Sequence, residues 1–350
     1  MNRIVIAAFA LAGMMAPLAH AQEPISFADS PPTMIIGHNP GGGTDITGRL
    51  IAMHIGKHLP GKPNVIVQNQ PGAEGMVSLN HLVNRTKPDG KTIIMGANIQ
   101  VEPANYRKPQ AQYDPATFHY FGGVGRGGTV VIINKEAEPR LNDKSKPPVI
   151  MGSIGGMPRT GMTITAWGIE HLGWNAKWVV GYPGTNEVML ALDRGEIDMT
   201  STGNMVLIKK ALDSGKFKIL VQSGTLEDGV HKPRSEFPDV PVFPNMMQGK
   251  IKDPVAKAAF DYWLSSTQLD KWVGLIGGTP KPIVDMYRKA FLDMSKDPEF
   301  MALGKKNTED FTPMPGQDIE ASVKVLTSTP QESLDYMGKM LRKQGIDVKQ

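Results

Sequence analysis

The sequence predicts an α/β protein of two domains, each with a largely parallel sheet flanked by helices. Three observations support this prediction. Short β-branched runs alternate with helix-like runs over much of the chain, which is the pattern of strand–helix–strand units. Loops rich in glycine and proline follow the strands, where ligands bind to such sheets. The 350 residues are also more than one hydrophobic core usually holds, so two domains are expected.

The first section of the chain contains three predicted strands and two predicted helices. Uninterrupted apolar runs, such as Val65 to Val67, are typical of strands that are covered on both faces. The first helix has apolar residues on two faces, with Ile46, Leu50 and Met53 on one of them, as expected for a helix inside a layered domain. The strands are Thr33–Ile36, Asn64–Gln68 and Lys91–Gly96, and the helices are Asp45–Leu59 and Met76–Asn84.

Residues from about 130 to 222 repeat this alternation and are predicted to form a second domain inserted into the first. The new section begins near the glycine-rich stretch Gly122–Gly128, of which Gly123–Gly128 is interpreted as a flexible connector before a strand. The predicted strands are Thr129–Asn134, Val149–Gly152, Ala176–Val180, Glu196–Thr200 and Lys218–Gln222, and the helices are Thr160–Leu172, Glu187–Asp193 and a third that ends at Leu212.

The chain after residue 222 is predicted to be mostly helical. Several of its helices start at or beside proline, which is tolerated in the first helical turn. The predicted helices are Asp253–Leu264, Pro282–Ser295, Asp297–Lys305, Gln317–Leu326 and Pro330–Gln344. The expected division is therefore a discontinuous lobe of residues 27–129 and 223–350, and an inserted lobe of residues 130–222.

Residues 1–21 have the composition of a secretory signal peptide. Arg3 precedes an apolar run from Ile4 to Met15, and Ala19-His20-Ala21 resembles a cleavage motif before Gln22. The run is too short to span a bilayer, although an uncleaved anchor is the alternative. We expect cleavage between Ala21 and Gln22, followed by export.

The composition excludes several classes of function. The chain has no cysteine, so thiolate zinc sites and a cysteine nucleophile are excluded. Its net charge is +4 and its basic residues are spread along the chain, whereas nucleic-acid-binding proteins concentrate them. No nucleic-acid partner is therefore expected. A mildly basic surface suits an anionic small molecule, although a generic soluble surface can carry the same charge.

The glycine-rich loop between the first strand and the first helix is the candidate ligand site. It reads Gly37-His38-Asn39-Pro40-Gly41-Gly42-Gly43-Thr44-Asp45. Glycine lets the backbone approach a ligand closely, and the start of a helix offers unpaired amides and partial positive charge. The pattern predicts a loop that binds a carboxylate. Asp45 or Thr44 could instead cap the helix, which is the favoured role of Asp45, and His38 could donate to a ligand or to the backbone.

Three stretches partly match known motifs but lack a required residue or context. Gly56–Pro63 follows a helix and ends in proline where a phosphate-binding loop needs Ser or Thr. Gly123–Gly128 has the spacing of the dinucleotide fingerprint but leads into a strand. Met151–Gly155 begins with methionine where the serine-hydrolase motif has glycine, so Ser153 is interpreted as a ligand contact.

Two histidines have the spacing of a metal-binding pair. His54 and His58 are four residues apart on a predicted helix, but the sequence offers no obvious third ligand. They are expected at the surface, and no metal site is predicted.

Several motifs together resemble one family, the substrate-binding proteins of tripartite tricarboxylate transporters, also called the Bug family of periplasmic receptors. The matching segments occur in the family's order. They are Gly41–Asp45, Val67–Gly75, Pro88–Thr92, Tyr113–Pro115, Phe237–Pro241 and Thr279–Val284. The resemblance implies a type II periplasmic-binding-protein fold, or Venus flytrap, in which two lobes close over a small organic carboxylate in the cleft between them.

The expected ligand contacts lie in loops of both lobes. The family's aromatic residue before the double glycine is His38 here, which changes polarity at the pocket wall. The expected contacts of the first lobe are His38, Asn39, Pro40, Gly41, Gly42, Gly43, Thr44, Asp45 and Asn98. Those of the second lobe are Ser153, Gly155, Tyr182 and Asn204.

The favoured hypothesis is a monomeric periplasmic binding protein, without a cofactor, that delivers its ligand to the membrane subunits of a tripartite tricarboxylate-type transporter. The lobes would close about a hinge near Gly128–Thr129 and Ser223–Gly224. The alternative is a sensor that presents the same ligand to a signalling receptor. A less favoured alternative is a secreted hydrolase that uses Ser153, which requires a histidine and an acid within reach of that serine. No other catalytic residue is expected.

Overall fold

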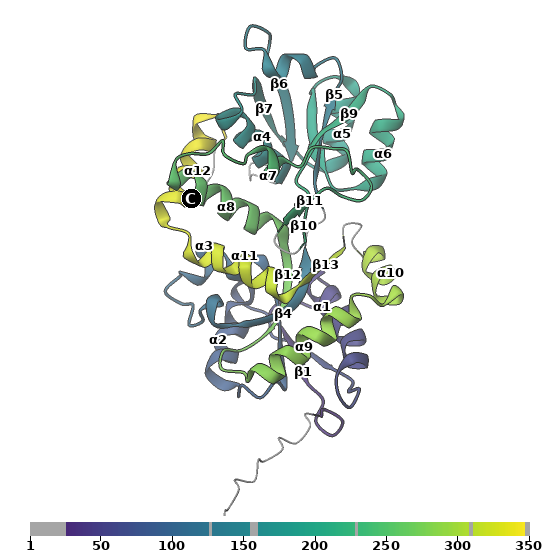
Figure 1. The fold of residues 1–350 in the computed structure, drawn as a ribbon, viewed down its shortest axis with the longest axis vertical. Coiled ribbons are helices and arrows are strands. Elements are labelled where there is room, and N and C mark those ends of the chain that lie inside the picture. The colour runs from purple at the N-terminus through teal and green to yellow at the C-terminus, as the bar shows by residue number, and fades with distance from the viewer. Residues whose placement is uncertain (1–25, 126–127, 155–159, 228–229, 308–310, 347–350) are drawn as a thin grey trace, which may run out of the picture.

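The computed structural model describes residues 26–125, 128–154, 160–227, 230–307 and 311–346. They form two lobes along the long axis of the molecule (Figure 1), each built around one sheet. The predicted signal peptide, residues 1–21, lies outside the described residues.

The strands are β1 Thr33–Ile36, β2 Ile66–Asn69, β3 Thr92–Ala97, β4 His119–Gly125, β5 Val130–Asn134, β6 Val149–Ile154, β7 Ala176–Tyr182, β8 Met199–Thr202, β9 Phe217–Gln222, β10 Thr225–Glu227, β11 Val230–Lys232, β12 Leu269–Leu275 and β13 Thr312–Pro315. The α-helices are α1 Gly43–Ile55, α2 Met76–Arg85, α3 Pro103–Tyr106, α4 Thr160–His171, α5 Thr185–Arg194, α6 Met205–Asp213, α7 Phe243–Met246, α8 Pro254–Gln268, α9 Lys281–Met294, α10 Pro298–Asn307, α11 Gly316–Ser328 and α12 Gln331–Lys343. The 3-10 turns are η1 Gly56–His58, η2 Ala73–Gly75, η3 Asn98–Val101, η4 Pro115–Thr117 and η5 Glu138–Asn142.

The two sheets have the same strand order, apart from an additional edge strand, β13, in the lower one. Written from the same side, the lower sheet runs β2-β1-β3-β12-β4-β13 and the upper sheet runs β7-β6-β8-β5-β9. Each sheet contains one inner strand that is antiparallel to both of its neighbours. In the lower sheet it is β12, between β3 and β4, and in the upper sheet it is β5, between β8 and β9. Apart from these strands and the edge strand β13, the strands of each sheet run in one direction. The predicted α/β fold with two mainly parallel sheets is therefore confirmed.

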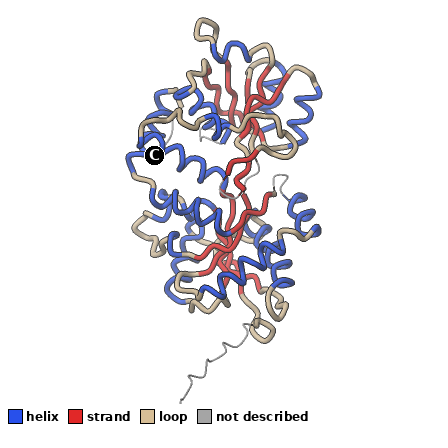
Figure 2. Tube along the Cα trace, in the orientation of Figure 1, coloured by secondary structure: helices blue, strands red, loops and turns tan. Residues whose placement is uncertain are grey.

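Helices cover both faces of the lower sheet (Figure 2). On one face, α1, α9 and α10 bury Ile51, Phe291 and Phe300 against the strands. On the other face, α2 and α11 bury Leu79 and Val323. These two apolar layers fix where α1 begins, and so they position the glycine-rich loop at the edge of the sheet that faces the upper lobe.

The upper lobe has the same layered construction. Helices α5 and α6 bury Leu192 and Ile208 on one face of its sheet. The other face is covered by α4, α7, α8 and α12, with Trp167, Phe260 and Leu341 in one buried cluster. Helices α7, α8 and α12 belong to residues 223–350, so this part of the chain also contributes to the core around residues 130–222. The division into 27–129 with 223–350 and 130–222 stays a prediction.

The flexible connector predicted at Gly123–Gly128 is wrong for Gly123–Gly125, because residues 119–125 form the inner strand β4. Residues 126 and 127 lie outside the described residues. A Cβ atom on Gly122 would lie 2.2 Å from the Phe291 ring, and one on Gly123 would lie 2.3 Å from the carbonyl oxygen of Lys271. The glycines therefore allow close packing within the sheet.

The prediction of a mostly helical region after residue 222 omits four strands, which are β10, β11, β12 and β13.

Candidate functional site

Three loops meet at the carboxyl edge of the lower sheet. Strands β2, β1 and β3 are parallel neighbours, and Ile36, the last residue of β1, pairs with Asn69 of β2 and Met95 of β3. The loops that follow these strands therefore begin side by side. Gln70 donates its amide to the carbonyl of Ile36 at 2.9 Å. This edge is where open α/β sheets bind ligands.

The buried carboxylate of Asp45 stabilises the glycine-rich loop through hydrogen bonds. It is 2 % exposed, and its carboxylate accepts hydrogen bonds from the Gly41 amide at 2.8 Å, Arg49 Nε at 3.0 Å and Asn69 Nδ2 at 2.7 Å. Asn69 also donates to the His38 carbonyl at 3.1 Å. Gly41 has a φ of +79°, which suits glycine at this turn.

The expectation that Asp45 caps the helix is corrected by this geometry. Helix α1 begins at Gly43, its N-cap is Gly42, and Asp45 lies inside the first turn. Burial acts to raise the pKa of Asp45, but the hydrogen bonds from Arg49, Gly41 and Asn69 outweigh burial, so this pKa lies below its usual value. Asp45 is thus an ionised scaffold residue whose acceptor positions are already used.

The start of α1 has no side-chain cap. Gly42 makes no capping hydrogen bond, and the amides of Gly43, Thr44 and Asp45 donate to no described residue. Gly42 and Gly43 are exposed, so an anion can reach these amides. Unpaired amides and the positive end of the helix dipole favour an anion at this position.

A lysine that the sequence analysis missed lies beside this helix start. A Cβ atom built on Gly43 would be 3.8 Å from Cε and 4.0 Å from Nζ of Lys271. Lys271 comes from β12, its side chain is only 13 % exposed, and its ammonium contacts the Asp270 carboxylate. Because β12 was not predicted as a strand, no sequence signal placed Lys271 next to Gly43, which precedes it by 271 − 43 = 228 positions.

His38 lies in the same electrostatic surroundings. Burial lowers the pKa of His38 and the charge of Lys271 lowers it further, while Glu74 acts in the opposite direction. Its buried Nδ1 has no hydrogen-bond partner among the described residues. It is the carbonyl of His38, and not its ring, that forms the hydrogen bond within the loop. The ring nitrogen Nδ1 is therefore available to a ligand. Asn39 and Pro40 are exposed at the tip of the loop.

Asn98, the remaining expected contact of the first lobe, faces different neighbours. Its amide donates to Glu102 Oε1 at 3.2 Å. It also lines a cavity of about 1010 Å³ together with Thr163 of α4, Trp263 of α8 and Arg342 of α12. This cavity is formed by residues of both sequence regions that the domain prediction separated.

The expected contacts of the second lobe occupy the carboxyl ends of its strands. Ser153 lies in β6 and is buried, and Tyr182 ends β7 and packs against an apolar cluster. Asn204 caps α6, since its Oδ1 accepts the Leu207 amide at 3.0 Å. Gly155 lies outside the described residues. No hydrogen bond or ion pair among the described residues joins these side chains to the glycine-rich loop, so their ligand role stays a prediction.

The hydrolase alternative lacks its required geometry. Within the described ranges, no hydrogen bond joins the Ser153 hydroxyl to a histidine or a carboxylate. Residue Gly152 beside it would place a Cβ atom 2.3 Å from Ile197, so the strand is closely packed rather than opened into a nucleophile turn.

Two of the chain segments that run between the lobes lie together, and a second missed residue links them. The Ser223 amide donates to the Thr129 carbonyl at 2.8 Å, and the Thr129 amide donates to Ser223 Oγ at 2.9 Å. Arg234, which is 6 % exposed, donates from Nη1 to the carbonyls of Gly128 at 2.9 Å and Gly203 at 3.2 Å. Arg234 therefore connects the crossing to the loop before Asn204.

The surface position expected for the histidine pair is wrong for His54. His54 is fully buried under α10, where its ring contacts Phe300.

The segment Gly56–Pro63 is a compact turn rather than a phosphate loop, because a Cβ atom on Gly56 would lie 2.1 Å from the Pro63 carbonyl oxygen.

Comparisons with known proteins agree with this architecture. The chain is 25 % identical over 347 residues to a UPF0065 protein of Bordetella pertussis, covering 95 % of this chain and 94 % of that protein. It is 27 % identical over 259 residues to a UPF0065 protein of Cupriavidus necator, covering 71 % and 73 %. A TctC solute-binding protein from Polaromonas shares the fold with a TM-score of 0.63 at 20 % identity, covering 89 % of this chain and 98 % of that structure.

The described residues between 26 and 346 include no helix that is both long and apolar enough to cross a membrane. The model of the tripartite tricarboxylate transporter family receptor matches residues 48–333, which is most of the chain. The match includes β2, β3, β12 and the whole of the inserted region. The chain therefore belongs to the tripartite tricarboxylate transporter receptor family.

Proposed function

We propose that this chain is a periplasmic receptor that binds a small organic carboxylate at the start of α1 and delivers it to the membrane subunits of a tripartite tricarboxylate-type transporter. The observation that carries the proposal is the uncapped helix start with Lys271 beside it. Three amides that donate to no described residue and one ammonium group, around an exposed loop, form a suitable site for a carboxylate. Membership of the receptor family supports the transport role.

The site residues have different parts in this proposal. The amides of Gly43 and Thr44 and the Lys271 ammonium bind one carboxylate, directly or through water. Asp45 and Asn69 position the loop. His38 Nδ1 meets a second polar group of the ligand, and Asn39 and Pro40 border the entrance. When the lobes close, Ser153, Tyr182 and Asn204 contact the ligand from the other side, with Asn98 at the margin.

The first test is a thermal-shift screen of dicarboxylates, tricarboxylates and aromatic acids, followed by calorimetry on each hit. A ligand that binds the folded state raises the melting temperature by linkage. Lys271→Gln should weaken binding of the hit by roughly 10- to 100-fold, the effect of losing one charged hydrogen bond. Lys281→Gln is the matched control, because Lys281 is 82 % exposed on the helix that follows β12.

A second variant tests the amides independently. Gly42 has φ −76° and ψ 164°, and a Cβ atom there meets only the Asn39 carbonyl oxygen at 3.4 Å. Gly42→Val should therefore fold but cover the helix start, and binding should be lost. Wild-type affinity in both Gly42→Val and Lys271→Gln would disprove the site, whereas no response to any carboxylate by the folded wild type would disprove the function.

A further inference from the structure

A buried histidine outside the ligand loop has one nitrogen without a partner. His54 lies in the last turn of α1, and its side chain is 0 % exposed. Its Nδ1 is 3.0 Å from the Leu50 carbonyl oxygen, so Nδ1 carries the hydrogen, and Nε2 has no hydrogen-bond partner among the described residues. Histidine that binds a metal through Nε2 usually donates from Nδ1 to a carbonyl or carboxylate in this way.

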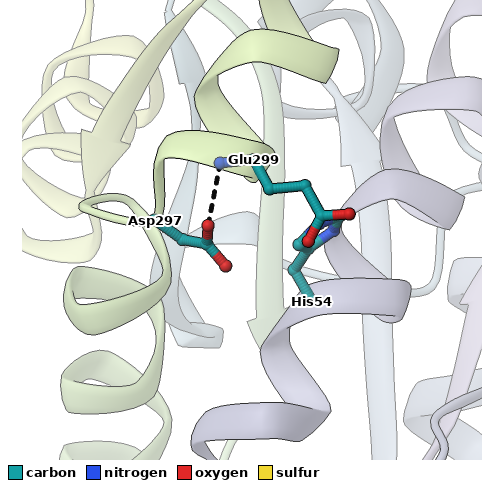
Figure 3. A group of neighbouring side chains, drawn as sticks. All are labelled: His54, Asp297 and Glu299. Atoms are coloured by element: carbon teal, nitrogen blue, oxygen red, sulfur yellow. Dashed lines mark hydrogen bonds and ion pairs between the residues drawn. The ribbon is translucent and has the colours of Figure 1, made fainter.

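Two carboxylates at the start of α10 face this nitrogen (Figure 3). Nε2 of His54 is 3.6 Å from Oε2 of Glu299, and one ligand atom each of His54, Asp297 and Glu299 lie within 4.8 Å of one another. Asp297 is held in place because it accepts the Glu299 amide at 2.9 Å. The Glu299 side chain is 63 % exposed, so it can move toward a bound ion without disturbing the core.

The charges around this cluster call for a cation. Nε2 of a neutral imidazole and a carboxylate oxygen are both acceptors, so their approach is favourable only with positive charge between or beside them. Lys57 supplies part of that charge, since its Nζ is 3.0 Å from the same Glu299 oxygen. The Lys57 side chain is half-exposed and does not donate to Nε2 of His54, which has no donor among the described residues.

We propose that His54, Asp297 and Glu299 form a binding site for a divalent transition-metal ion such as Zn²⁺, with water completing its coordination. One imidazole nitrogen with two carboxylate oxygens suits zinc and its neighbours, whereas Mg²⁺ and Ca²⁺ prefer oxygen ligands alone. The ion joins the end of α1 to the start of α10. Helix α1 has 13 residues and is therefore about 20 Å long, so the ion stabilises the lower lobe without touching a ligand at Gly43.

Calorimetry of the untagged protein with zinc sulfate tests the proposal. The wild type should bind one zinc ion, and its melting temperature should rise with zinc and fall back with a chelator. Glu299→Gln and Asp297→Asn should each weaken binding by at least roughly 10- to 100-fold, the range found even for outer-sphere changes at metal sites. Asparagine can still cap α10, so the second variant keeps its fold. Lys57→Gln should bind zinc more tightly, because it removes a competing cation.

Glu332→Gln is the matched control, since Glu332 is an exposed acid in the first turn of α12, and it should bind zinc like the wild type. Carboxylate binding should be the same in all four variants. Absence of saturable zinc binding by the folded wild type would overturn the proposal. Wild-type zinc affinity in Glu299→Gln, or in a His54→Gln variant that is folded by circular dichroism, would overturn it as well.

Discussion

At the scale of single residues, one buried carboxylate determines the conformation of the glycine-rich loop. An ionised group is costly to bury unless hydrogen bonds replace its hydration. Asp45 receives them from Arg49, from Asn69 and from the Gly41 amide. The same bonds direct the loop amides: that of Gly41 points inward to the carboxylate, whereas those of Gly43 and Thr44 donate to no described residue. Asp45 therefore determines the shape of the loop, and its predicted contact with the ligand stays a prediction.

Asp45→Asn should destabilise the protein by about 1–3 kcal/mol at pH 7, because it turns one acceptor into a donor among existing donors. The pKa of Asp45 is lowered by folding, so its contribution is present above the unfolded value of 3.8 and is lost as the pH falls through the folded value. Urea unfolding at several pH values should show the wild type and the variant converging below pH 3.8. A constant difference across that range would contradict this account, and the exposed Asp29→Asn serves as control.

At the scale of elements, the inner strands of the lower sheet depend on glycines that lie against large side chains. Trp272 of β12 is fully buried and donates its Nε1 hydrogen to the Ala97 carbonyl at 3.0 Å. A Cβ atom on Gly96 of β3 would lie 2.2 Å from the Trp272 ring. The position of β12, and with it that of Lys271, therefore depends on glycine at residue 96.

Gly96→Ala should destabilise the protein by about 1–3 kcal/mol, the usual cost of overpacking a core. Chemical denaturation followed by tryptophan fluorescence measures the effect. Gly338→Ala is the opposite case, because a Cβ atom there first meets the Arg342 guanidinium at 3.3 Å in helix α12, and alanine is favoured over glycine in a helix by ~1 kcal/mol. Equal stability of the two variants would refute the role of the Gly96–Trp272 contact.

At the scale of the whole molecule, the lobes are joined where the chain crosses between the sheets. The paired segments at Thr129 and Ser223 form a short double connection. Helix α8 starts against the upper sheet and leads directly into β12 of the lower sheet. A rotation about these connections would carry Ser153 and Asn204 toward or away from the glycine-rich loop.

A carboxylate identified by the thermal-shift screen should close the lobes and reduce the radius of gyration measured by small-angle X-ray scattering. A ligand that contacts both lobes would bind a closed form more tightly than an open one and so favour it. The ligand at saturation should also shift the scattering of Lys281→Gln but leave Gly42→Val unchanged. An unchanged radius of gyration in a wild type that is saturated with ligand would contradict domain closure.

Local patterns predicted the elements whose conformation depends on neighbours in the chain. The run Thr33–Ile36 is β1 with the same bounds, and the apolar faces of α1 placed that helix to within a few residues. Strands β4 and β12 were missed because glycine hides their apolar pattern and because their pairing joins residues far apart in the sequence. His54 was expected at the surface because nothing near it in sequence shows that α10 covers it.

The amino-acid sequence by itself determined the alternating strands and helices of an α/β protein, the glycine-rich loop at a strand–helix junction and the family motifs that include this loop. These features depend on local backbone preference and on side-chain periodicity, which short stretches of chain contain. Only the tertiary structure decided that Lys271 lies beside the loop, that the Asp45 carboxylate accepts hydrogen bonds from Gly41 and Asn69, and that His54 faces Asp297 and Glu299. Such contacts depend on the order in which strands and helices pack, and that order is a property of the whole folded chain.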